Sequence, residues 1–358
     1  MEGVMIFPYD NKSKPLVKAN RWLSDMQIRV LGFPKGWEIF NEWDEFQDIK
    51  KSTEYNKMVE LCSVLWIVDA EHELSNDDYI FPLIERAVQE NKKIICTRIL
   101  NEEENKRFDK IVPEKNRCIL KEEPSFKLKY SLEFFHINTP VLLICGMFEN
   151  LNKFLIQVGI REEFISRGYK VCQIGSRQCS NILGFYPMPQ FMFDSSISEK
   201  DKILMFNHYL KIKEVQEKPD IIIIGIPGGI FPFSEKIVEN FGMMLYEITQ
   251  TVNVDCTVFS TPYYEEISSV VDIFSEQAMK MYNFDIDYFI VQNKMIELME
   301  SEIEHKMVYL TLPQNHIVNG INRVGKDNIF YIDDKQMSKD LVDSIIDKLK
   351  SYKQIQLI

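Results

Sequence analysis

A glycine, an asparagine and a lysine follow a short apolar run near the middle of the chain. Residues 141–153 read VLLICGMFENLNK, with Gly146 directly after five apolar residues and with Asn152 and Lys153 at the end. A strand, a loop and a helix that carries a lysine near its start form the layout with which P-loop proteins hold phosphate groups. This segment therefore predicts the binding of an anion or a nucleotide.

The segment departs from the P-loop sequence at the residues that would surround the phosphates. Counted from Gly146, the positions for Gly-Lys-Ser/Thr hold Leu151, Asn152 and Lys153, so the lysine comes one residue late. Phe154 follows, and its side chain cannot ligate Mg²⁺. Two interpretations stay open: a modified anion or nucleotide pocket, or a helix that Asn152 caps beside a solvated Lys153.

A glycine-rich turn follows the most apolar predicted strand. Residues 221–224 are four isoleucines, and the next five residues read GIPGG. The acidic residue that holds Mg²⁺ in a P-loop protein would be expected at Gly225, and Asp220 lies at the wrong end of the strand. The glycines allow positive φ and close backbone approach, which suits an anion or another chain. A tight turn between strand and helix is the alternative.

The carboxyl ends of strands in an open α/β sheet converge on one crevice, so polar residues after several strands should gather there. They include one lysine, one arginine, amides and hydroxyls, a set that would take ATP or GTP with Mg²⁺ as cofactor. No catalytic residue and no metal ligand is assigned among them. The candidate anion- or nucleotide-binding residues are Gly146, Glu149, Asn152, Lys153, Ser176, Arg177, Gln178, Gly225, Pro227, Gly228, Gly229, Ser260, Thr261 and Asn293.

Other reaction classes find less support in the sequence. No serine stands in a GxSxG motif, which argues against acyl transfer, and the five histidines have no metal-ligand spacing. His72 could reach a crevice of the first half of the chain together with Asp10 and Asp69. A structural role for this histidine is the alternative.

Composition indicates a globular protein without a nucleic-acid or membrane surface. The 358 residues are 45% hydrophobic, and 54 acidic against 42 basic residues give a net charge of −12. This balance argues against binding to nucleic acid or to an anionic membrane. The seven cysteines form no CxxC pair. Without a signal peptide or an 18-residue apolar run, the sequence predicts a cytoplasmic protein with reduced thiols.

The elements that must position these residues alternate between strand and helix, which predicts an α/β fold with mainly parallel sheets. We expect a Rossmann-like domain over residues 1–125, a connector over 126–140 and a P-loop-like domain over 141–358. Strands are expected at 4–7, 28–32, 63–68, 93–96, 118–120, 141–145, 171–174, 221–224, 256–260, 288–292 and 307–311. Helices are expected at 16–23, 79–89, 102–111, 153–166, 198–213, 234–251, 265–282 and 339–350, with a hairpin at 320–331. Residues 184–193 predict a packed, proline-containing loop.

Several stretches together resemble a small family of peptide maturation system proteins. The stretches are VMIFPYD, FPKGW, GMFENLNKF, RGYKVCQIGSR, PMPQFMF, KILMFNHYLK and PDIIIIGIPGGIFPF. Members are encoded beside radical SAM enzymes and short precursor peptides in bacterial natural-product clusters. The resemblance implies a role in maturing a ribosomally made peptide and supplies no catalytic residues. More distantly, the second domain is similar to P-loop NTPases of the kind that include dethiobiotin synthetase.

Two functions follow as hypotheses. The first is an accessory protein that binds a precursor peptide or a radical SAM maturation enzyme, without conventional NTP hydrolysis. The alternative is a ligase- or kinase-like enzyme that uses ATP or GTP through a variant loop, with Lys153 on the phosphates. The absence of a Ser or Thr after Lys153 and of an acid after Ile224 favours the first.

Overall fold

The computed structural model divides into two compact units, which are described separately. One comprises Met1–Pro124 with Asn181–Gly184, and the other Ser125–Ser180 with Phe185–Ile358. The structure describes residues 1–10, 12–23, 25–37, 46, 48–70, 74–118, 133–239, 241–332 and 339–355.

The first unit is built on a five-stranded parallel sheet with the strand order β3-β2-β1-β4-β5. Val4 to Phe7 on the central strand are fully buried, as expected for a strand that helices cover on both faces. The strands are β1 (Glu2–Phe7), β2 (Met26–Gly32), β3 (Lys50–Ser52), β4 (Val64–Ile67) and β5 (Lys93–Cys96). The helices are α1 (Lys14–Lys18), η1 (Ala19–Trp22), α2 (Tyr55–Glu60), η3 (Asn76–Ile80), α3 (Phe81–Gln89), α4 (Glu102–Ile111) and η4 (Glu114–Asn116).

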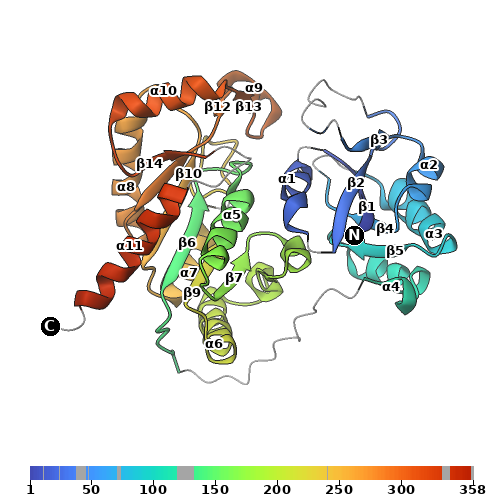
Figure 1. Cartoon of the computed structure of the whole chain (residues 1–358), viewed down its shortest axis with the longest axis horizontal. Helices are drawn as coiled ribbons and strands as arrows, with labels where there is room; N and C mark the ends of the chain where they lie inside the picture. Colours follow the sequence, from blue (N-terminus) through green and yellow to red (C-terminus); the bar gives the residue numbers. More distant parts are fainter. Residues whose placement is uncertain are drawn as a thin grey trace. The chain divides into compact units, whose positions relative to one another are not determined.

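The second unit contains a larger parallel sheet with the order β14-β11-β10-β6-β9-β7-β8 (Figure 1). Its strands are β6 (Val141–Gly146), β7 (Val171–Gly175), β8 (Tyr186–Pro187), β9 (Ile221–Gly225), β10 (Cys256–Thr261), β11 (Tyr288–Val291) and β14 (Ile329–Tyr331). A separate antiparallel pair joins β12 (Lys294–Ile296) to β13 (Tyr309–Thr311). The helices are α5 (Lys153–Ser166), η6 (Gln190–Phe193), α6 (Glu199–Glu217), α7 (Met243–Thr251), α8 (Ile267–Tyr282), α9 (Leu298–Glu304), α10 (Gln314–Val324) and α11 (Lys339–Ile355). The short helix η5 (Gln178–Leu183) begins in the second unit and ends in the segment that belongs to the first. Both sheets are parallel and alternate with helices, so the predicted α/β class is confirmed.

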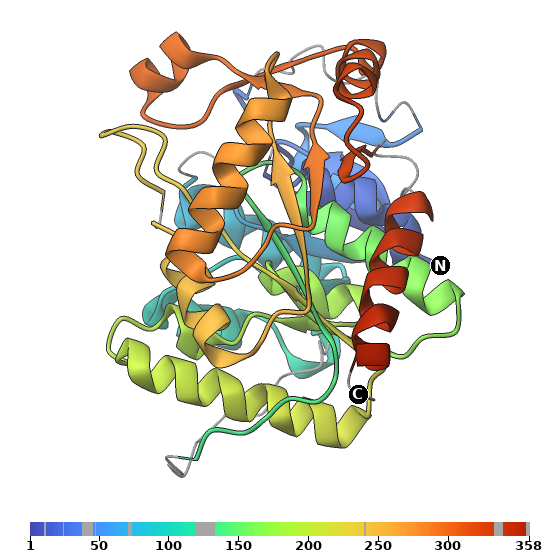
Figure 2. The ribbon, with the colours of Figure 1, turned by 90° about the vertical axis from the view of Figure 1, so that its left-hand side faces the viewer.

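Two apolar clusters cover the two faces of this second sheet. Alternate residues of β6 point to opposite sides: Leu142 and Ile144 pack with α5 and α11, and Leu143 packs with α6, α7 and α8. The strands lie between α8 and α11 in Figure 2. Because β6 and β9 are buried throughout, their positions in the layer are fixed by apolar packing on both sides.

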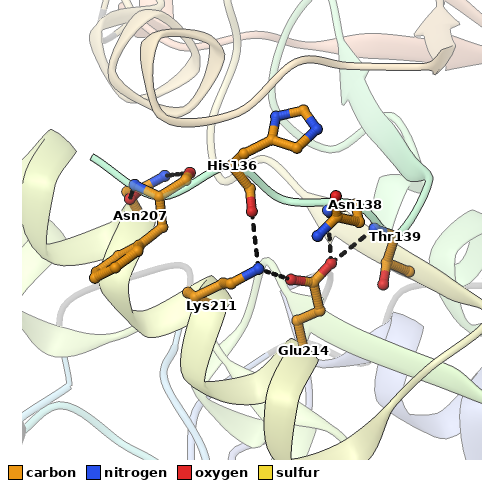
Figure 3. Close-up of polar contacts among 7 residues, drawn as sticks. His136, Asn138, Thr139, Asn207, Lys211 and Glu214 are labelled. Carbon is orange, nitrogen blue, oxygen red and sulfur yellow. Dashed lines mark hydrogen bonds and ion pairs between the residues drawn. The ribbon is translucent and has the colours of Figure 1, made fainter. Parts of the chain in front are cut away.

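Polar side chains of α6 hold the chain that leads into β6 (Figure 3). Asn207, which is fully buried, accepts from the N–H of Phe135 at 2.7 Å and donates to the carbonyls of Phe135 and Thr251 at 2.9 and 3.0 Å. Two turns further on, a carboxylate oxygen of Glu214 accepts from the N–H groups of Asn138 and Thr139, both at 2.7 Å. These bonds fix the register with which the chain enters the central strand.

Charge pairing keeps Glu214 ionised in this position. Burial favours its neutral form, but hydrogen bonds from Lys211 and from the amides of Thr139 and Asn138 outweigh burial and lower its pKa. Lys211 also donates to the carbonyl of His136 at 2.8 Å, which ties the same connector down at a further point.

The predicted helix over residues 234–251 is wrong in its first half, because α7 begins only at Met243. Glu239 and Phe241 have φ angles of 51°, and Gly242 has 67°. A right-handed helix cannot contain such left-handed residues. Ser234 instead accepts from the N–H groups of Lys236 and Ile237 in a turn.

The hairpin predicted over residues 320–331 is also wrong. Residues up to Val324 belong to α10, which ends at Gly325 with a φ of 64°, and β14 then joins the main sheet parallel to β11. The apolar side of α10 buries Ile317 against the second unit's core, which favours helix over hairpin.

Other differences concern short elements. The expected strand at 307–311 is β13, which pairs with β12 outside the main sheet. β3, α2 and α9 were not predicted, since they are short and lack a clear period. Residues 119–120 of the strand expected at 118–120 lie outside the described residues. The loop at 184–193 is packed as expected, with Met188 and Met192 almost fully buried.

Among the described residues, no helix combines the length and the apolar character needed to cross a membrane.

Asn207→Ala should destabilise the second unit by about 2 to 4 kcal/mol, because it leaves three backbone groups, one of them fully buried, without their partner. Urea unfolding followed by circular dichroism measures this. Asn319→Ala, at an exposed position on α10, is the control and should change stability by less than about 0.5 kcal/mol. An equally small effect of Asn207→Ala would contradict the role of Asn207 in holding the connector that leads into β6.

Candidate functional site

The carboxyl end of β6 lies at the point where the sheet's strand order reverses. From β6 the chain passes through α5 to β7, two places to one side, and it later returns from β9 to β10 on the other side. In open α/β sheets, ligands bind beyond the carboxyl ends of the strands at such a point. The loop of residues 147–152 and the start of α5 occupy this position, so the sequence placed its candidate segment correctly in the fold.

Lys153 is the first residue of α5, and its side chain turns back over the loop. Its Nζ lies 3.0 Å from the carbonyl oxygen of Phe148 and also donates to the carbonyl of Gly228 in a short hydrogen bond. The residue is only 7% exposed. The interpretation of Lys153 as a solvated residue is therefore wrong: its ammonium group joins the loop after β6 to the loop after β9.

Backbone conformation allows the lysine to reach this place. Asn150 and Asn152 adopt left-handed φ angles of 59° and 52°, which asparagine tolerates better than most residues. Gly146 has no side chain in the way, and an added Cβ would lie 2.8 Å from Cδ of Lys153. Asn152 stands at the N-cap position without a capping bond, so the predicted cap is wrong; its Nδ2 donates to Oε1 of Gln292 at 2.8 Å.

The GIPGG turn makes a close backbone approach to the β6 loop. The N–H of Ile230 donates to the carbonyl of Met147 at 3.1 Å. Gly228 has a φ of 71°, and a Cβ on Gly229 would come within 2.7 Å of the Cα of Phe148. These glycines thus let a neighbouring loop of the same protein approach closely.

A carboxylate that the sequence did not reveal joins the same two loops. Glu239 accepts from the N–H of Glu149 at 3.1 Å through Oε1 and from the N–H of Gly229 at 2.9 Å through Oε2. Burial raises the pKa of Glu239, while the N–H of Glu149 acts against this. No motif could have identified it, because it belongs to the segment where a helix was expected.

Gln157 of α5 also went unrecognised, although it is fully buried beside the candidate residues. It donates to Oγ of Ser176 at 2.9 Å and accepts from the N–H of Ser176 at 3.3 Å. A Cβ at Gly225 would lie 2.1 Å from this carboxamide, so a larger residue at the end of β9 would require Gln157 to move. The sequence signal that could have identified Gln157 is its place as a polar residue one helical turn after Lys153 on α5.

Ser260 and Thr261, at the end of β10, support the loop rather than face solvent. Oγ of Ser260 donates to the carbonyl of Leu151 at 2.7 Å, and its own carbonyl accepts from the N–H of Met147 at 2.9 Å. Thr261 is fully buried, and its hydroxyl donates to the carbonyl of Pro262 at 3.2 Å.

The remaining candidates make other contacts. The guanidinium carbon of Arg177 is 5.4 Å from the ring centre of Phe154. Gln178 donates to the carbonyl of Met188 at 3.4 Å. Asn293 is half-buried, and its carbonyl accepts from the N–H of Leu312 at 2.8 Å. Pro227 is half-buried beside Gly228.

In the first unit, Asp10 and Asp69 accept hydrogen bonds from backbone N–H groups. Asp10 accepts from the N–H of Ser13 at 2.9 Å, and Asp69 accepts from the N–H of Ile99 at 3.0 Å. His72 lies outside the described residues.

The electrostatics of the site combine the ammonium group of Lys153 with two nearby carboxylates. Burial lowers the pKa of Lys153 to about 8, whereas the nearby Glu149 and Glu239 act to raise it. The lysine is thus mostly charged at neutral pH, and the first turn of α5 adds N–H groups without helical partners. The described residues contain no cluster of His, Cys, Asp or Glu suited to a metal ion.

Comparison with solved structures shows the fold of the whole chain in another protein. A DUF1611 family protein from Anabaena variabilis superposes with a TM-score of 0.63 at 11% sequence identity, covering 97% of this chain and 100% of that chain. FtsY from Elizabethkingia anophelis covers 58% of this chain and 65% of that chain at 14% identity, and its TM-score of 0.34 is too low to support an inference. No protein-family model matches the sequence, and no curated protein matches it significantly.

Replacing Lys153 should change how stability depends on pH. Its pKa of about 8 lies below the value of 10.5 expected in the unfolded chain, so the unfolded chain binds more protons between these values. The unmodified protein should therefore gain on the order of 2 kcal/mol relative to Lys153→Met as the pH rises from 8 to 10.5. Chemical unfolding at several pH values measures the difference.

Lys200→Met, at an exposed position on α6, is the control, and its stability curve should run parallel to that of the unmodified protein. If Lys153→Met also runs parallel, the lysine is not held in the buried position described above.

Proposed function

We propose that the second unit binds a phosphate-bearing ligand, with ATP or GTP as the leading candidates, at the loop between β6 and α5. The observation that carries this proposal is the position of Lys153. It is a buried, largely charged lysine at the start of a helix, at the reversal point of a parallel sheet, with its ammonium held by loop carbonyls. A phosphoryl oxygen is a better partner for ammonium than a carbonyl.

The same residues argue for binding without conventional hydrolysis. Phe154 follows the lysine and is almost fully buried, so no hydroxyl stands at the position that usually ligates Mg²⁺. Gly225 ends β9, and the carboxamide of Gln157 fills the space next to it. An ATP- or GTP-dependent ligase- or kinase-like enzyme remains the alternative, and it would have to recruit Mg²⁺ through the ligand or other residues.

Nucleotide should stabilise the protein against heat, and Mg²⁺ should add little to this effect. A ligand at about a hundred times its dissociation constant adds roughly 2.7 kcal/mol, which a shift of the unfolding midpoint reveals. We expect Lys153→Met to lose the shift and Lys200→Met to retain it. No shift with millimolar ATP or GTP would contradict nucleotide binding, and a strictly Mg²⁺-dependent shift would favour the enzyme alternative.

We further propose that this binding serves the maturation of a ribosomally made peptide, as an accessory protein to a radical SAM enzyme. The support is the resemblance of seven stretches to peptide maturation system proteins. Two of them, GMFENLNKF and PDIIIIGIPGGIFPF, form the two loops that Lys153 connects. The resemblance thus includes the residues of the candidate site.

A tagged form of the protein should retain the precursor peptide or the radical SAM enzyme when it is co-expressed with the genes beside its own. Mass spectrometry of the purified complex identifies the partner, and an unrelated α/β protein with the same tag is the control. If neither partner is retained above the control, the accessory role loses its support.

A further inference from the structure

Two backbone N–H groups from different loops converge on one carboxylate beside Lys153. Glu149 belongs to the loop after β6 and Gly229 to the loop after β9, and their N–H groups donate to the two oxygens of Glu239 at 3.1 and 2.9 Å. Backbone N–H groups that converge next to an ammonium form a binding position for an oxyanion. Here the occupant of that position is a side chain of the protein itself.

The position is shaped for this occupant. A Cβ on Gly229 would lie 2.6 Å from the carboxyl carbon of Glu239 and 2.7 Å from one of its oxygens, so only glycine leaves room for it. Lys153 attracts the carboxylate, and Glu149 repels it. A second anion could not enter while Glu239 is present, because it would meet both the same space and the same negative charge.

The backbone around Glu239 is held in an unfavourable conformation. Glu239 and Phe241 both have left-handed φ angles of 51°, which cost roughly 1 kcal/mol each for residues of these types. Val238 and Phe241 are 37% and 55% exposed, so little apolar burial holds them in place. Movement of Glu239 away from the loops would therefore uncover little of Val238 and Phe241, whereas Ile237, which is 7% exposed, is the buried apolar side chain of the segment.

We propose that Glu239 is an internal competitor for the ligand. Its carboxylate fills the oxyanion position formed by the N–H groups of Glu149 and Gly229, and the terminal phosphoryl group of the ligand takes this position when Glu239 withdraws. The inference rests on the proposed function, since it concerns the same site. It adds a regulatory element: a change that draws the segment Ser234 to Glu239 away from the loops opens the site.

The test compares ATP binding by titration calorimetry at pH 7 without Mg²⁺. If the competitor occupies the position about nine-tenths of the time, its removal strengthens the apparent affinity about tenfold. We expect this gain for Glu239→Gln and Glu239→Ala. Glu149→Gln removes a neighbouring charge without freeing the N–H groups, so it should gain at most about threefold. Glu235→Gln, an exposed change in the same segment, should leave the affinity unchanged.

The outcomes separate this inference from the proposed function. If the unmodified protein binds ATP and the Glu239 variants bind it equally or more weakly, the competitor role is overturned and the proposed function stands. If none of the proteins binds ATP, both are overturned. Thermal unfolding confirms that each variant is folded, and Glu239→Gln preserves the side chain's size for this purpose.

Hydrogen exchange of the unmodified protein provides a second measurement that needs no variant. Saturating ATP should increase exchange in peptides that cover Ser234 to Glu239 and should slow exchange at the N–H groups of Glu149 and Gly229. Unchanged exchange in the segment on ATP binding would show that Glu239 does not leave, and would overturn the proposal.

Discussion

The burial of one ammonium group constrains the whole ligand-binding edge of the second unit. An unpaired lysine in such a position would be strongly unfavourable, so its hydrogen atoms must meet acceptors. Lys153 finds them in the carbonyls of Phe148 and Gly228, which belong to loops on adjacent strands. The loops must therefore lie close together, and this requirement explains the glycines at positions 146 and 229, where side chains would collide with the lysine or with the facing loop.

A second requirement follows from the first. The two loops direct carbonyl groups toward the ammonium group, so N–H groups of the same loops point in other directions. Two of these N–H groups meet at the carboxylate of Glu239. Across the same pair of loops, the ammonium group of Lys153 therefore contacts backbone carbonyls, and the carboxylate of Glu239 contacts backbone N–H groups. The opposite charges of Lys153 and Glu239 thus offset one another within the protein itself.

The sequence predicted the regular elements better than the contacts between loops. Strand β5 and helices α4 and α5 coincide with their predicted bounds, because apolar periods and glycine or asparagine ends mark them. The same alternation of strands and helices predicted which strand ends form the site. The position of Glu239 could not be predicted in this way, because it depends on left-handed backbone at Glu239 and Phe241, residue types that rarely adopt this conformation. The burial of Lys153 was equally hidden, since it results from how two loops meet and not from local spacing.

The contact between Gln157 and Gly225 also bears on how this protein could change over evolutionary time. A carboxylate at position 225 would place a Mg²⁺ ligand where P-loop enzymes carry one, but the Gln157 carboxamide lies 2.1 Å from the first atom of any side chain there. A smaller residue at 157 would in turn leave Ser176 without its partner. A side chain at position 225 would therefore require the Gln157 carboxamide to move away from Ser176 or to be replaced. Changes at these two buried positions are thus coupled, and we expect them to occur together in a lineage that acquires a metal-dependent site.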